Sequence, residues 1–104
     1  MSEPAIFYPS SQPPVPSIGR IVWYRLSADD VRALARERDD AGICGNPLKA
    51  GEQYPAVIVR VWGETPQAAC SLHVHLDGPD VYWATSRHLG DQNGNWSWPP
   101  RTGA

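Results

Sequence analysis

The sequence has little lysine, an almost balanced charge and no long apolar run. Of its nine basic residues only Lys49 is lysine, and eleven acidic residues bring the formal net charge to −2. A charge so close to neutral argues against bulk binding to nucleic acid or to an acidic membrane, since both require a basic excess. No apolar stretch approaches the roughly 18 residues that span a bilayer, and the chain does not open with a secretory signal pattern. We therefore expect a cytoplasmic protein with no membrane partner.

Cysteine is also scarce, and the usual catalytic motifs are missing. Cys44 and Cys70 form no CxxC pair, which argues against a disulfide scaffold or a redox motif. Cys70 falls in an alternating apolar pattern and is interpreted as a core residue, whereas Cys44 lies in a loop without an accompanying base. Walker, Rossmann and Ser-His-Asp patterns are absent. We expect no enzymatic activity, no catalytic residue and no cofactor.

One short motif resembles a metal site without completing it. His73, His75 and Asp77 match the start of the HxHxDH signature of metallo-β-lactamase-type hydrolases, but Gly78 stands where the last histidine belongs. Two histidines at this spacing on a strand place both rings on one face, which falls short of a closed metal site. We expect no functional metal and interpret both histidines as solvated or ligand-facing.

Length and turn residues define the organisation of the chain. The 104 residues fit one domain, and 11 prolines and 9 glycines indicate many turns and short elements. Residues 1–17 contain five prolines around the apolar trio at 6–8, which predicts an extended arm with polyproline character and a candidate contact to a neighbouring subunit. Residues 18–101 are predicted to form a single small β domain, and residues 102–104 a tail.

Hydrophobic periodicity predicts mostly strands. Strands are expected at 20–26, 56–62, 70–76 and 81–87, with 96–98 as a short fifth strand that locks the C-terminus onto the fold. Ser27 and Asp30 have the spacing of a capping box, so a helix is expected to begin at Ser27 and to end near Asp39. One helix inserted after the first of four or five strands predicts a mainly β fold, with a small, strongly bent antiparallel sheet or partial barrel.

Strict alternation along the strands predicts a candidate binding face. If Val57, Val59 and Val61 point inward, Ile58 and a set of aromatic and basic side chains share the opposite surface. These candidate ligand-binding residues are Trp23, Arg25, Arg60, Trp62, His73, His75, Trp83 and Arg87. Guanidinium groups suit phosphate and indoles suit base stacking. The alternatives are a subunit interface, or a surface covered by the helix and the N-terminal arm, and the preference for arginine can also reflect codon usage.

An ordered series of segments carries a resemblance. GRIVWY at 19–24, PAVIVRVW at 55–62, LDG at 76–78, WATS at 83–86 and WSWPPR at 96–101 resemble a family of small hypothetical tailed-phage proteins. Such proteins typically open with a GRIVHY-like strand and finish with a GTWHWPER-like segment. Trp23, Asn95 and Pro100 stand where the family usually has histidine, threonine and an acid. The resemblance, which covers about residues 16–101, implies a phage origin and a small β fold but no particular activity.

Two functions remain open. The first is a phage-encoded, non-enzymatic sponge in the host cytoplasm that sequesters a nucleotide-derived immune signal of the cyclic dinucleotide or ADP-ribose type, by analogy of size, origin and side chains. The second is a virion accessory protein or protein–protein adaptor that uses the same aromatic side chains. Both predict a homo-oligomer, because an aromatic sheet face and an apolar arm expose much surface for a small monomer.

Overall fold

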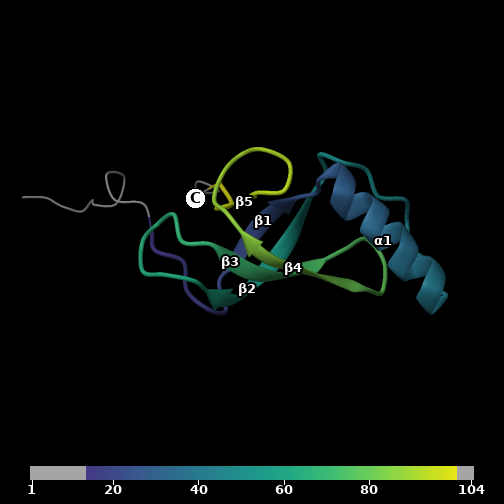
Figure 1. Ribbon diagram of the computed structural model, residues 1–104, viewed down its shortest axis with the longest axis horizontal. Helices are drawn as coiled ribbons and strands as arrows, with labels where there is room; N and C mark the ends of the chain where they lie inside the picture. Colours follow the sequence, from purple (N-terminus) through teal and green to yellow (C-terminus); the bar gives the residue numbers. More distant parts are fainter. Residues whose placement is uncertain (1–13, 101–104) are drawn as a thin grey trace, which may run out of the picture.

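The computed structural model describes residues 14–100, so most of the expected arm (1–13) and the expected tail lie outside the described residues. Five strands and one helix follow one another along the chain (Figure 1). In order they are β1 (Ile21–Arg25), α1 (Ala28–Ala41), β2 (Gln53–Val61), β3 (Cys70–His75), β4 (Val81–Arg87) and β5 (Trp96–Ser97).

The strands form one antiparallel sheet in the order β4-β3-β2-β1-β5. The predicted mainly β fold with a helix inserted after the first strand is therefore confirmed. The sheet does not close into a barrel. A single parallel bridge between Leu89 and Trp96 nevertheless brings the segment after β4 against β5. The sheet consequently curls, with a concave inner face around the core and a convex outer face.

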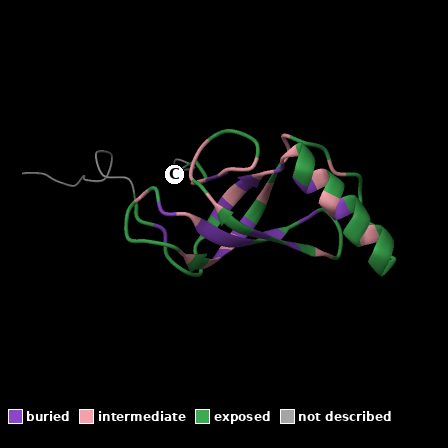
Figure 2. Cartoon of the chain, viewed as in Figure 1, coloured by how far each residue is buried: buried purple, intermediate pink, exposed green. Residues whose placement is uncertain are grey.

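The inner face carries the core. Figure 2 shows the buried residues concentrated in the strands, while the turns and most of the helix surface are exposed. Trp96, Tyr24 and Ile58 are fully buried and are among the largest side chains of this core. Trp96 Nε1 donates a hydrogen bond of 3.1 Å to the carbonyl of Arg87, so β5 is held at both its backbone and its side chain. Burial of the indole stabilises the C-terminal end of the domain.

Helix α1 begins as predicted and ends slightly later. Ser27 Oγ accepts a hydrogen bond from the Asp30 backbone N–H, and Asp30 accepts one from the Ser27 N–H, which completes the capping box. The helix continues to Ala41 because Gly42, with a φ of 66°, is the first residue that takes the left-handed conformation of a helix end. Figure 1 shows α1 at one end of the sheet, beside the turn between β3 and β4.

Strand β2 begins three residues before the predicted residue 56, at Gln53. Proline usually interrupts a strand, but Pro55 pairs with Trp23 of β1 and belongs to β2. The ladder between β2 and β3 reaches only as far as Ala56 opposite Val74. Pro55 therefore lies where one side of the strand has no ladder partner, and there a missing N–H is tolerated.

Candidate functional site

Two bulges flank Ser71 and determine which side chains reach the outer face. On β2 the register shifts between Ile58 and Arg60, and on β4 the residues Thr85 and Ser86 lie between the pairs formed by Cys70 and Leu72. Each neighbouring strand thus places two residues opposite Ser71. Ser86 has a φ of 58°, which is typical of a residue at such an irregularity. Because an extra residue reverses the alternation, the face of every residue beyond each bulge changes.

Because of the first bulge, the predicted inner and outer faces of β2 are wrong for the residues before it. Ile58 is fully buried opposite Leu72, and Val57 lies on the outer face opposite His73, the reverse of the prediction. Beyond the bulge the prediction holds, because Val61 pairs with the buried Cys70. The run from Ala56 to Val61 has apolar residues at both odd and even positions, so alternation alone cannot show which residues face the core.

Because of the second bulge, the Arg87 side chain lies on the inner face and not on the predicted outer face. Arg87 Nη2 donates hydrogen bonds to Asp30 Oδ1 at 3.1 Å and to Tyr82 Oη at 3.2 Å, both on the inner side of the sheet. The Arg87 guanidinium carbon also lies 5.6 Å from the centroid of the Tyr24 ring. Arg87 is therefore part of the contact between helix and sheet and does not lie beside Trp83.

Asp30 is the centre of this contact. Its carboxylate is 2% exposed and accepts hydrogen bonds from Tyr24 Oη at 2.6 Å, Tyr82 Oη at 2.7 Å and the Ser27 N–H at 2.9 Å. Burial by itself raises the pKa of Asp30, but the hydrogen bonds and the charge of Arg87 outweigh it and hold that pKa below the usual value. Burial and the same carboxylate raise the pKa of Tyr82 to about 12. The network ties the first turn of α1 to side chains of the inner face and so holds the helix at this end of the sheet.

The outer face presents a continuous row of side chains across four strands. Ile21 pairs with Val57, Val57 with His73, and His73 with Trp83. We call these four residues the outer row. Ile21 is 60% exposed and Trp83 65%, His73 is exposed, and Val57 is half-buried. At the usual strand spacing the row is about 14 Å long, and its two ends are large apolar groups in solvent.

Three other predicted residues share this face. The polar groups of two of them, Trp23 and Arg25, are largely enclosed or already bonded within the chain. Trp23 lies half-buried opposite Ser97, and its Nε1 is enclosed without a hydrogen-bond partner among residues 14–100. Arg25 is half-buried and donates through Nη1 to the carbonyl of Gly51 at 2.9 Å. His75 is exposed and pairs with Val81. Arg25 is thus committed to the loop before β2, and only His75 is freely presented.

Arg60 and Trp62 form a separate pair at the bulged end of β2. The Arg60 guanidinium carbon lies 4.2 Å from the centroid of the Trp62 ring, within the range of a cation–π contact. Trp62 is 51% exposed, and its Nε1 donates to Ser71 Oγ over 3.3 Å. Ser71 also contacts Thr85 Oγ1 at 3.1 Å. The indole is therefore oriented by the residue that lies between the two bulges.

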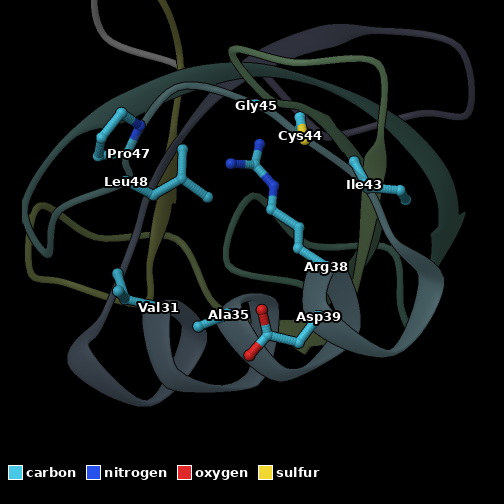
Figure 3. A pocket seen from close by; sticks show the side chains of 9 residues that line it. All are labelled: Val31, Ala35, Arg38, Asp39, Ile43, Cys44, Gly45, Pro47 and Leu48. Carbon is cyan, nitrogen blue, oxygen red and sulfur yellow. The ribbon is translucent and has the colours of Figure 1, made fainter.

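A pocket of about 330 Å³ lies away from this face, between α1 and the loop over residues 43–48 (Figure 3). Its central cation, Arg38, is held by Asp80 through bonds of 2.8 and 3.0 Å and by the carbonyl of Asn46 at 2.9 Å. A Cβ at Gly45 would lie 2.6 Å from Arg38 Nη2, so a larger residue there requires the Arg38 guanidinium to shift. Cys44 is exposed at the pocket wall. The pocket therefore combines an apolar wall with the engaged Arg38 guanidinium, the Asp39 carboxylate and the Cys44 thiol.

The described part of the chain contains no group of three or more histidine, cysteine, aspartate or glutamate residues placed to hold a metal ion. His73 and His75 thus remain a pair. Over the same residues, no helix combines the length and the apolar character that a membrane crossing requires.

The sequence pattern predicted only His73 and Trp83 of the four outer-row residues. It placed Val57 in the core and did not include Ile21, whose exposure follows from its position opposite Val57. Comparisons of the chain with protein families, with curated proteins and with solved structures find no match.

Proposed function

We propose that the chain is a non-enzymatic adaptor that uses its outer row to bind the surface of another protein. The observation that carries this proposal is the register of Ile21, Val57, His73 and Trp83, which aligns two strongly exposed apolar side chains across four strands. Large apolar side chains exposed together on one face, in contrast to singly scattered ones, are typical of an interaction surface. Exposed tryptophan is moreover the side chain most often found at the energetic centre of protein interfaces.

Charge on the strands indicates the kind of partner. The four long strands contain no aspartate or glutamate, while Arg60, His73 and His75 lie on the outer face. Complementary potentials favour a partner whose contact surface has an apolar centre and carboxylates at its rim. The convex shape of the outer face also favours a protein surface, because small ligands are usually bound in concave sites.

Site-specific cross-linking in cells that produce the protein tests this proposal. A photoreactive amino acid is placed at Trp83, and as a matched control at Arg36, which is exposed on α1. We expect position 83 to give a cross-link to a discrete protein other than a second copy of the chain, and position 36 to give none. That protein is then purified and titrated calorimetrically with the unmodified chain, and direct binding is expected. Equal cross-linking from both positions, or no binding between the purified proteins, would contradict the proposal.

A second candidate function rests on the Arg60–Trp62 pair. An exposed guanidinium stacked on a half-exposed indole suits a ligand with a phosphate and a base, such as a cyclic dinucleotide or an ADP-ribose derivative. This sponge function uses one arginine where the sequence suggested three, because Arg25 and Arg87 are engaged within the chain. Calorimetric titration with both ligand classes tests it, and the absence of heat and of any thermal shift would exclude it.

Origin and location belong to the same proposal. The resemblance of 19–24 and 96–101 to small tailed-phage proteins supports a phage origin, and with it a place in the host cytoplasm or in the virion. Detection of the chain in purified virions would favour the virion accessory role, whereas its presence only in infected cells would favour the cytoplasmic adaptor or the sponge.

A further inference from the structure

The outer edge of β4 is open. Within residues 14–100, β4 is the terminal strand of the sheet and pairs only with β3. Among residues 14–100 no backbone hydrogen bond reaches its other side from Val81 to Ser86. The bulge begins at Thr85, so Val81 to Ala84 form the regularly paired segment of this strand. A regular strand edge with unpaired N–H and C=O groups is a template for pairing with another strand.

The opposite edge of the sheet is protected. β5 has only two residues, and Pro99 and Pro100 follow shortly after it. Short edge strands and prolines are the usual means by which proteins prevent edge-to-edge pairing. The sheet therefore has one open edge and one blunt edge, and a head-to-tail contact from β4 of one copy to β5 of the next is disfavoured.

β4 also lacks the charges that normally protect an edge. Residues 81–86 contain no charged side chain, and Val81 and Trp83 are 48% and 65% exposed. The charged residues at either end are occupied, since Asp80 is bound to Arg38 and Arg87 to Asp30. Two copies of this strand can thus approach without repulsion between like charges.

We propose that a second copy of the chain pairs with β4 in antiparallel fashion around a two-fold axis at Trp83. This contact joins two sheets into one and places the two Trp83 side chains across from each other on the outer face. In this register Val81 of each copy lies opposite Thr85 of the other. An isologous contact uses the open edge of both copies, so the assembly closes as a dimer and does not grow into a filament. The inference follows from the edge of the sheet and does not rest on the proposed adaptor function.

The molar mass in solution, measured by size exclusion with light scattering over a dilution series, tests the dimer. We expect twice the 11.5 kDa mass of the chain. Two double variants test the register. Val81→Lys with Thr85→Lys places like charges opposite each other at both ends of the contact and should give a monomer. Val81→Lys with Thr85→Glu places opposite charges there and should preserve the dimer.

The two double variants change the same exposed positions, so they act as folding controls for each other, and circular dichroism and thermal melting should show both to be folded. Ile21→Lys, on β1 and remote from the edge, should leave the dimer intact. A monomeric wild-type chain would overturn the proposal, as would a dimer of the double-lysine variant or equal dissociation of both double variants. Because these masses are measured without any partner, failure of the adaptor proposal would not change them.

Discussion

Arg87 Nη2 donates a hydrogen bond to Asp30 Oδ1 over 3.1 Å and so ties the end of β4 to the first turn of α1. The same carboxylate accepts hydrogen bonds from two tyrosine hydroxyls and from a backbone N–H. A buried carboxylate is stable only when its hydrogen-bonding capacity is satisfied in this way. Asp30 therefore determines the position of the helix, and it also draws Arg87 away from the outer face.

Substitution of Asp30→Asn should strongly destabilise the fold. The amide removes the charge that faces Arg87 and replaces an acceptor by a donor against the tyrosine hydroxyls, which predicts a loss of about 3 kcal/mol in the free energy of unfolding. Urea denaturation followed by circular dichroism measures this loss. Asp29→Asn is the matched control, because the Asp29 side chain is 87% exposed, and it should change stability by about 0.5 kcal/mol or less. Equal effects of the two substitutions would contradict the role of Asp30.

The ion pair between Arg38 and Asp80 predicts a specific pH dependence. Both side chains are 11% exposed, and the hydrogen bonds from Arg38 lower the pKa of Asp80 below its usual value. A lowered folded-state pKa contributes stability above the unfolded value of about 3.9, and that contribution is lost as the pH falls through the folded-state pKa. Asp80→Asn should thus cost about 2 kcal/mol at neutral pH.

The difference between wild type and Asp80→Asn should shrink as the pH falls below about 4, because the wild-type carboxyl is then protonated as well. Urea denaturation of both proteins at neutral and acidic pH provides the comparison. A difference that stays constant over this range would show that the charge of Asp80 does not stabilise the fold.

Two tryptophans should respond very differently to the same substitution. Trp96 is fully buried, so Trp96→Ala should cost about 3 to 5 kcal/mol through the cavity it leaves. Trp83 is 65% exposed, so Trp83→Ala should change the free energy of unfolding by about 0.5 kcal/mol or less in the monomer. Denaturation at a concentration where the chain is monomeric tests both. A large loss for Trp83→Ala would mean that its side chain packs within the chain.

If a nucleotide-derived ligand binds, Arg60→Ala should weaken its binding by about 1.5 to 3 kcal/mol, the range for a hydrogen bond to a charged group. Arg36→Ala, on the exposed surface of α1, is the control and should leave the affinity unchanged. Calorimetry with the bound ligand measures both variants. An unchanged affinity for Arg60→Ala would remove the Arg60–Trp62 pair from the binding site.

The fold could largely be predicted from the sequence because its signals are local. The capping box at Ser27 and Asp30 and the alternation from Cys70 to Val74 indicate the helix and β3 directly. The composition of the candidate face could be predicted only in part, since Trp83, His73 and His75 follow simple alternation and lie where it places them.

The remaining assignments failed at the bulges. Nothing local in the run from Ala56 to Val61 indicates an extra residue, and the shift at Thr85 and Ser86 depends on what Ser71 bonds across the sheet. The partner of Arg87 lies 57 residues away in the chain, so sequence patterns could not place its side chain. Register irregularities and distant ion pairs are properties of the assembled sheet.

The affinity of the purified cross-linked partner for two isoleucine variants tests the outer row most directly. Ile21 belongs to the row and is 60% exposed, whereas Ile18 is 71% exposed in the turn before β1 and lies outside the row. The account predicts that Ile21→Lys weakens binding by roughly tenfold or more, as loss of an anchor residue does, and that Ile18→Lys leaves it unchanged. Equal affinities for the two variants would contradict it.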